Sequence, residues 1–236
     1  MHPPHPRPHG RRHPRRRQHP TREALTTTRP ISSSPVTARL KFFYGPMDCG
    51  KSTLALQIHH NHTRSGRKGL LLTRHDRSGS PRITTRIGLA KNATELTDDH
   101  DVRALANTHN ADYVICDEVQ FYPVGHIEQM ADLVDCDGID VYAFGLATDF
   151  RSVLFPATQR LLELADEALR LQVEVLCWCG SEGQLNARVI DGHVARAGQQ
   201  VVIGDTDDAT VHYQVLCRKH YRAGELAAVE AFTEAS

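Results

Sequence analysis

The sequence predicts an α/β fold in which a mainly parallel sheet is covered by helices on both faces. Between residues 38 and 176, apolar stretches of strand length alternate with helical patterns, which indicates parallel strands joined by right-handed crossovers. A glycine-rich run at residues 45–52 joins the first strand directly to the first helix. Residues 181–214 contain few large apolar side chains and lie between pairs of Cys and His, so we expect a small appended subdomain there.

The individual elements follow from apolar runs and helical spacing. The first strand, at residues 40–44, is the run Leu-Lys-Phe-Phe-Tyr, and we expect the next helix over 52–64. Pro156 stands at a tolerated first-turn position of a helix expected over 156–169. The other expected strands cover residues 68–73, 113–116, 141–144 and 171–176, with an extended piece at 83–86, and the other expected helices cover residues 98–109 and 123–134.

Charge is distributed unevenly along the 236 residues. The net charge is zero, but residues 1–36 contain eight Arg and one Glu, a charge of +7, so the remainder carries −7. The segment is also rich in His and Pro, and we expect a disordered arm without a secretory signal. It is interpreted as a solvated tail, as the product of a start codon assigned too far upstream, or as a tether for nucleic acid or an acidic surface. No apolar run approaches the roughly 20 residues that a membrane span needs.

The glycine-rich run fits the phosphate-binding pattern G-x-x-x-x-G-K-[ST] at every fixed position. Backbone N–H groups and the following helix N-terminus would bind phosphate oxygens. Lys51 would reach the terminal phosphates, and the Ser52 hydroxyl would hold Mg²⁺. The expected nucleotide-binding residues of this run are Gly45, Pro46, Met47, Asp48, Cys49, Gly50, Lys51 and Ser52. We therefore expect a P-loop NTPase domain of the RecA-like kind.

A second element of the predicted phosphate site is the acidic end of the strand at residues 113–116. Ligands of open α/β sheets bind at the carboxyl ends of strands, so Asp117 would complete the Mg²⁺ shell opposite Ser52. Glu118 could accept the proton of an attacking hydroxyl or orient a water, and Val119 and Gln120 extend the ATP-contacting run. The guanine-reading Asn-Lys-x-Asp pattern of GTPases is absent from the sequence, which favours ATP.

Four residues near the carboxyl end have the chemistry of a structural zinc site, namely Cys177, Cys179, Cys217 and His220. Thiolates and imidazole are preferred zinc ligands, and four of them close a tetrahedron. The alternative is three buried or free cysteines and a surface histidine. The placement of the six cysteines argues against a disulfide framework and for a reducing, cytoplasmic compartment.

Four motifs together resemble the thymidine kinase family of the small, zinc-containing, bacterial type. They are Gly45-Pro46-Met47 with Gly50-Lys51-Ser52, Asp117-Glu118-Val119-Gln120-Phe121, Gly145-Leu146 with Asp149-Phe150-Arg151, and Tyr213 with Cys217-Arg218 and His220. The resemblance covers residues 40–221. It implies phosphorylation of thymidine, and of deoxyuridine, at the 5′-hydroxyl by ATP-Mg²⁺, giving dTMP and ADP in the salvage of DNA precursors.

The resemblance also implies roles for particular residues. Glu118 is the implied general base, and the segment between the zinc pairs is a lasso-like loop that closes over the base. The implied nucleoside contacts are Met47, Phe121, Leu146, Phe150, Val201, Val202, Ile203, Gly204 and Tyr213. A homotetramer inhibited by the triphosphate product is implied, with no membrane association and no requirement for nucleic acid.

With the resemblance, the chain divides into four parts. We expect a disordered arm at residues 1–37, an ATP-binding kinase domain at 38–176, a zinc-binding lasso subdomain at 177–221 and a tail at 222–236. Two other functions stay open. One is a kinase for another nucleoside, and the other is a zinc-bearing nucleic-acid binding module or ATP-driven remodeller, which the basic arm motivates but the acidic body disfavours.

Overall fold

A six-stranded sheet forms the centre of the computed structural model, which describes residues 38–74, 81–200 and 211–227. All its strand pairings are parallel, in the order β5-β2-β6-β7-β1-β8. The strands are β1 (Leu40–Tyr44), β2 (Gly69–Thr73), β5 (Thr94–Glu95), β6 (Tyr113–Cys116), β7 (Asp140–Gly145) and β8 (Glu167–Arg170). The predicted arm at 1–37 lies outside the described residues.

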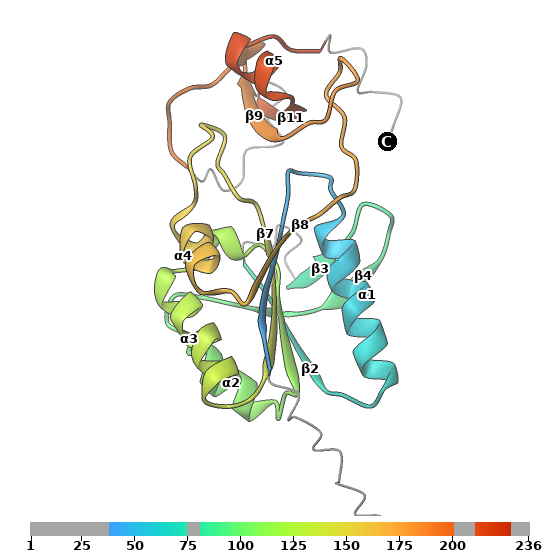
Figure 1. The fold of residues 1–236 in the computed structure, drawn as a ribbon, viewed down its shortest axis with the longest axis vertical. Coiled ribbons are helices and arrows are strands. Elements are labelled where there is room, and N and C mark those ends of the chain that lie inside the picture. Colours follow the sequence, from blue (N-terminus) through green and yellow to red (C-terminus); the bar gives the residue numbers. More distant parts are fainter. Residues whose placement is uncertain (1–37, 75–80, 201–210, 228–236) are drawn as a thin grey trace, which may run out of the picture. The chain divides into compact units, whose positions relative to one another are not determined.

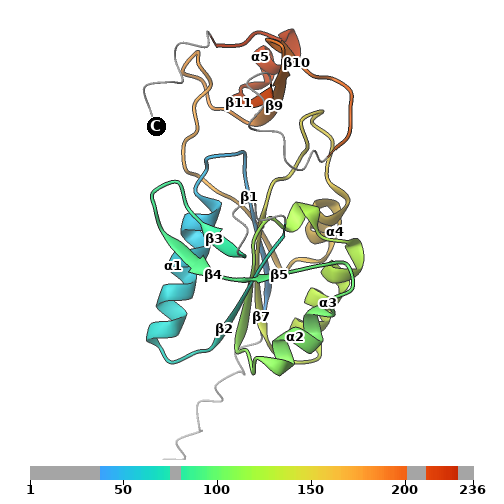
Figure 2. The same cartoon turned by 180° about the vertical axis from the view of Figure 1, so that it is seen from behind.

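Helices cover both faces of this sheet, as predicted (Figure 1). On one face lies α1 (Lys51–Arg64), with the antiparallel hairpin of β3 (Arg82–Thr84) and β4 (Ala90–Asn92) beside it (Figure 2). On the other face lie α2 (Val102–Thr108), α3 (Val124–Asp135) and α4 (Pro156–Leu164).

Each face of the sheet has its own hydrophobic core because neighbouring strand residues point in opposite directions. Phe42 belongs to the core under α2, α3 and α4, whereas Phe43 belongs to the core under α1. The residues of β6 are all buried, which is typical of a central strand in a parallel sheet. The two cores fix the carboxyl ends of β1, β6 and β7 at one edge, where the predicted site residues follow.

A second sheet, which the sequence analysis did not predict, follows the main body. Its antiparallel strands have the order β10-β9-β11, and a short helix follows the last strand. These elements are β9 (Leu185–Ile190), β10 (His193–Val194), β11 (Val211–Leu216) and α5 (Arg218–Ala223). Their small core includes Cys177, Ala187, Leu216 and Tyr221.

The predicted boundary between the last helix and strand of the main body was wrong. The helix expected over 156–169 ends at Leu164, and the strand expected over 171–176 is instead β8 (Glu167–Arg170). The Asp166 carboxylate accepts the Leu40 N–H at 2.8 Å, and Glu167 pairs with Lys41 at 3.0 Å. These contacts with β1 outweigh the helix-forming composition of the segment. Among the described residues, no helix is long and apolar enough to cross a membrane.

Candidate active site

The predicted phosphate loop lies between the end of β1 and the start of α1. Gly50 has φ = 78°, a left-handed conformation that is strained for residues with a Cβ atom. The first-turn N–H groups of α1 have no intrahelical partner, so they can bind phosphate oxygens. Lys51 Nζ donates to Pro46 O at 2.7 Å and lies 3.7 Å from Cys49 Sγ. The Lys51 side chain is therefore hydrogen-bonded to its own loop.

Other residues of the phosphate loop also form specific contacts. A Cβ atom at Gly45 would lie 2.5 Å from Cys49 Sγ, and Cys49 is fully buried. Asp48 forms an ion pair with Arg86 at 2.6 Å, between two largely exposed side chains. The Met47 N–H donates to a side chain of β9, Asn186 Oδ1, at 2.8 Å. The loop thus contacts both the turn of the β3–β4 hairpin and the second sheet.

The acidic end of β6 meets the phosphate loop directly. Ser52 Oγ donates to Asp117 Oδ2 at 2.9 Å, although the two residues follow strands that are separated in the sheet by β7. Asp117 is buried, and burial together with the charge of Glu118 raises its pKa to about 7. A buried carboxylate beside a hydroxyl is a donor set that fits Mg²⁺, which prefers oxygen ligands.

Glu118 is held by its neighbour Gln120. Glu118 has φ = 54° and stands at the start of the 3₁₀ turn η1 (Val119–Phe121), in which Val119 is fully buried. Gln120 Nε2 donates to Glu118 Oε2, and Gln120 Oε1 accepts the Leu146 N–H at 3.0 Å. Because a backbone N–H can only donate, this second bond fixes which end of the amide faces Glu118. The buried glutamine therefore orients the carboxylate.

Two of the predicted nucleoside residues lie where the main body meets the second sheet, since Phe150 contacts Arg188 of β9 and Tyr213 belongs to β11. Phe121 packs edge to face on Phe155, with ring centroids 5.8 Å apart. Phe150 is buried after β7, and Tyr221 Oη donates to its carbonyl oxygen at 2.7 Å. The predicted base-binding residues Val201, Val202, Ile203 and Gly204 lie outside the described residues.

A small hollow opens between the phosphate loop, the segment after β7 and β9. Its volume is about 50 Å³. Neither Met47 nor Leu146 lines this hollow, and their place in the nucleoside pocket stays a prediction. The hollow is lined by Tyr44, Gly45, Pro46, Ala147, Thr148, Gln184 and Asn186.

Two polar residues of β9, Asn186 and Arg188, were missed by the sequence analysis. Both are buried, and they alternate with the fully buried Ala187 and Val189. Arg188 Nε donates to Tyr213 Oη at 2.8 Å. The alternation of polar and apolar residues in Leu-Asn-Ala-Arg-Val-Ile is the signal that could have identified a strand with a functional polar face.

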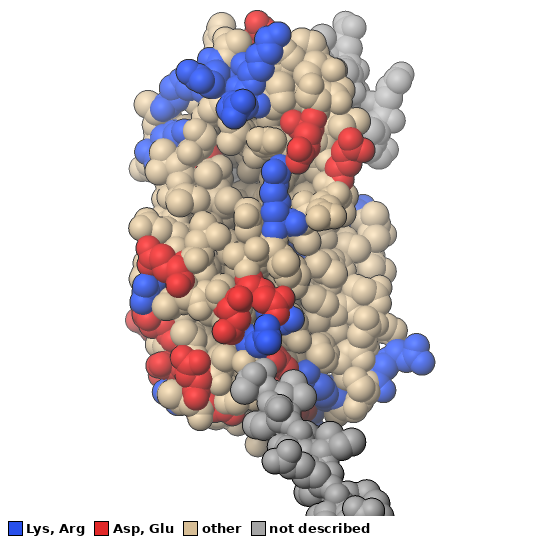
Figure 3. All heavy atoms as spheres, viewed as in Figure 1, with Lys and Arg blue, Asp and Glu red and all other residues tan. Residues whose placement is uncertain are grey.

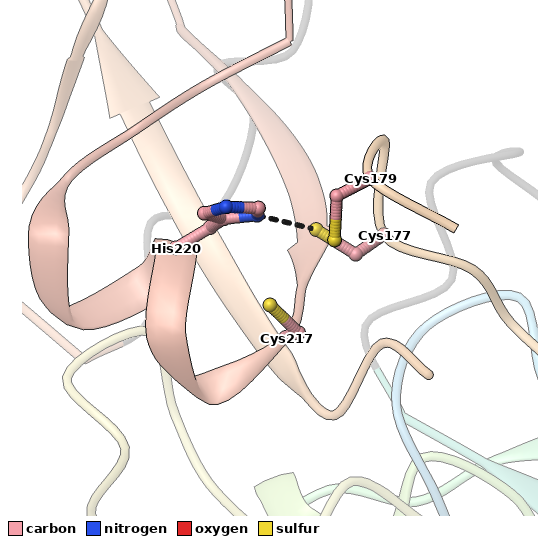
Figure 4. A group of neighbouring side chains, drawn as sticks. All are labelled: Cys177, Cys179, Cys217 and His220. Atoms are coloured by element: carbon pink, nitrogen blue, oxygen red, sulfur yellow. Dashed lines mark hydrogen bonds between the residues drawn. The ribbon is translucent and has the colours of Figure 1, made fainter. Parts of the chain in front are cut away.

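The four predicted zinc ligands lie together (Figure 4). Their ligand atoms are all within 4.8 Å of one another, and Cys177 Sγ lies 3.4 Å from His220 Nδ1. Zinc–ligand bond lengths place the donor atoms of a tetrahedral site about 3.5–3.8 Å apart, so the cluster could hold zinc. Glu225 Oε2 lies 3.5 Å from His220 Nε2, where a carboxylate would orient the imidazole.

The family of the chain follows from comparison with known proteins. The family model described as thymidine kinase matches residues 38–221. The chain belongs to the thymidine kinase family. Relatives described as thymidine kinase include one from Cutibacterium acnes, 49% identical over 79% of this chain and 89% of that protein. One from Streptomyces coelicolor is 50% identical over 78% of this chain and 88% of that protein.

Membership of the thymidine kinase family confirms the predicted family and the predicted enzyme class, a nucleotide-binding kinase. Among solved structures, a Pif1 helicase from Candida albicans has a TM-score of 0.35 and 13% identity, over 57% of this chain and 36% of that chain. A likeness this low carries no argument about function.

Proposed function

We propose that the chain transfers the terminal phosphoryl group of ATP to the 5′-hydroxyl of thymidine, giving dTMP and ADP. The family supports the choice of nucleoside. The single observation that supports the site is the 2.9 Å hydrogen bond from Ser52 to Asp117. It joins the phosphate loop and the acidic strand end, so that one ligand could contact both.

In this proposal the phosphate loop, with residues 117–120, binds ATP. The loop amides and Lys51 neutralise the charge of the transferring phosphoryl group. Charge stabilisation and positioning supply most of the catalytic effect in phosphoryl transfer. Lys51 must then leave Pro46 O and turn towards the phosphates. Ser52 and Asp117 would hold Mg²⁺, which would supply charge neutralisation for the transferring phosphoryl group.

Glu118 accepts the proton of the 5′-hydroxyl as the new bond forms. A carboxylate in this role must be within hydrogen-bond reach of the hydroxyl, and the bond from Gln120 restricts where it points. Glu118 is partly exposed, so a substrate hydroxyl can approach it.

The nucleoside would bind at the junction between the kinase domain, 38–176, and the lasso subdomain, 177–221. Phe150 and Tyr213, which share Arg188 as a partner, support this placement. Met47, Phe121 and Leu146 complete the proposed contacts, and Val201–Gly204 remain a prediction based on the family resemblance.

Zinc has a structural role in this proposal. Cys177 and Cys179 precede the three-stranded sheet and Cys217 and His220 follow it, so one ion would tie both ends of the subdomain. We also propose a homotetramer, on the family resemblance, and a cytoplasmic location, which suits the six unpaired cysteines.

A turnover assay with ATP and Mg²⁺ tests the function. We expect thymidine and deoxyuridine to be phosphorylated well, and deoxycytidine and deoxyguanosine poorly. Metal analysis of the same sample should give one zinc per chain. A preference for another nucleoside would leave the site in place but reassign the substrate.

A nucleic-acid-binding function is the alternative to test beside it. Lys and Arg side chains gather over α5, whereas Asp and Glu side chains gather over α2 and α3 (Figure 3). ATP hydrolysis that is stimulated by nucleic acid, without nucleoside phosphorylation, would favour this alternative. We expect no stimulation.

A further inference from the structure

Arg188 is a buried cation with an unusual set of partners. Its side chain, on the central strand β9 of the second sheet, is 4% exposed. Nε donates to Tyr213 Oη at 2.8 Å, Nη1 to Gln199 O at 2.9 Å and Nη2 to Gln200 O at 3.3 Å. Among the described residues, no carboxylate forms an ion pair with it. All three guanidinium nitrogens therefore bind neutral oxygens.

The flat face of the same guanidinium packs on an aromatic ring. Its central carbon lies 3.9 Å from the centroid of the Phe150 ring, a close cation–π contact, and 5.6 Å from that of Tyr213. Tyr213 stands opposite Arg188 in the β9–β11 register. Arg188 thus connects a residue of the main body with a residue of the second sheet.

A second path of contacts closes a ring of interactions around Arg188. Gln200, whose carbonyl accepts from Arg188, donates through Nε2 to Asp149 Oδ2 at 3.2 Å. Asp149 precedes Phe150 in the chain, so Arg188 is linked to this segment directly through the Phe150 ring and, by way of Gln200, through the Asp149 carboxylate. Because a buried cation costs free energy unless it is well bound, the arrangement tolerates little displacement of any partner.

We infer that Arg188 is a positioning residue for the nucleoside, which holds the rings of Phe150 and Tyr213 in their substrate-binding arrangement. The inference depends on the proposed function, in which these two rings contact thymidine. The guanidinium is suited to this role because its planar donors fix three acceptors while its face fixes a ring, which an ammonium group cannot do.

The test is steady-state kinetics of Arg188→Met, which retains an unbranched apolar side chain but removes the guanidinium with its donors and its charge. We expect the KM for thymidine to rise about 10- to 100-fold, the range for losing hydrogen bonds to a charged group. The KM for ATP should stay within about twofold, because Arg188 contacts none of the phosphate loop. Arg188→Lys should give an intermediate KM for thymidine.

Arg196→Met is the matched control in the same subdomain. Arg196 also packs on an aromatic ring, Tyr221, at 4.5 Å, and also donates to backbone carbonyls, those of Tyr221 and Arg222. We expect its KM for thymidine to be that of the wild type.

An unchanged KM for thymidine in Arg188→Met would overturn the inference. An equal loss for ATP and thymidine would also overturn it, because that result indicates a purely structural role. If Arg188→Met does not fold, the same comparison is made with Arg188→Lys. An unchanged KM for thymidine, or an equal rise in KM for ATP and thymidine, would then overturn the inference. A wild-type chain that does not phosphorylate thymidine would instead refute the proposed function.

Discussion

At the scale of single residues, the site depends on which atoms of a side chain already form hydrogen bonds. The Gln120 amide presents its NH2 group to Glu118 because its oxygen faces and accepts the Leu146 N–H. The Asp117 carboxylate accepts from Ser52 and from the Glu118 N–H, so both its oxygens are bonded despite its burial. These hydrogen bonds give the carboxylates of Asp117 and Glu118 different environments, which suits different roles for them.

A buried histidine gives a pH prediction at this scale. Burial lowers the pKa of His126 from its usual 6.5. Nε2 lies 2.9 Å from His100 O and so must donate, while Nδ1 has no partner within the described part of the chain. Burial opposes the charged ring more than the neighbouring carbonyl of His100 favours it, so the folded state favours the neutral ring.

The sign of the effect follows from linkage. At a pH between the lowered pKa of folded His126 and 6.5, the unfolded chain binds more protons than the folded chain. The contribution of His126 to the free energy of unfolding is therefore full above about pH 6.5 and is lost as the pH decreases through that window. Burial raises the pKa of Asp117 to about 7, which acts in the opposite direction in the same pH range, so the prediction concerns the difference between two proteins. Between about pH 7.5 and about pH 5.5 we expect the urea midpoint of the wild type to decrease relative to that of His126→Gln. The lowered pKa values of His59 and His62 affect both proteins, so an equal change in both would contradict the prediction.

Sequence spacing identified the residues whose function depends on local geometry. The phosphate loop, the acidic pair and the zinc ligands were predictable because each set has a fixed spacing along the chain. Asn186 and Arg188 were not, since their roles depend on distant partners. Asn186 binds Met47, which is 139 residues away.

At the scale of elements, β1, β2, β6 and β7 were predictable because they are short apolar runs in the centre of the sheet, whereas the two-residue strand β5, Thr94–Glu95, has no apolar signal and was missed. The three-stranded sheet has a weaker signal than these strands, because β9 carries Asn and Arg and β11 carries His, Tyr and Gln. The position of β8 was also missed, since pairing with β1 decides it and helix propensity does not.

The contact between β9 and the phosphate loop predicts an effect across two elements. Asn186→Leu removes the acceptor of the Met47 N–H and leaves that donor unpaired, which costs about 1–3 kcal/mol. We expect a lower melting temperature and weaker ATP binding, measured by thermal unfolding and by titration calorimetry.

Gln184→Leu is the control for this variant. Gln184 lines the same hollow and is exposed, and its backbone N–H bonds to Leu216 O in the β9–β11 pair. The substitution leaves that backbone bond in place. ATP affinity that falls equally in both variants would show that the Met47 bond is not the cause.

At the scale of the whole molecule, zinc removal should separate the two binding functions. A chelator should loosen residues 177–220 and abolish nucleoside binding at concentrations that leave ATP binding measurable. Limited proteolysis with mass spectrometry would report new cuts in that segment. The same cutting pattern with and without the chelator would refute the structural role of zinc.

The central claim is that the phosphate loop and the acidic end of β6 form one site, in which Glu118 accepts the proton of the 5′-hydroxyl. The most direct test is single-turnover phosphorylation of thymidine by Glu118→Gln, with ATP affinity measured on the same protein. We expect ATP to bind nearly as in the wild type while transfer slows about 10²-fold or more. Transfer at the wild-type rate would contradict that claim.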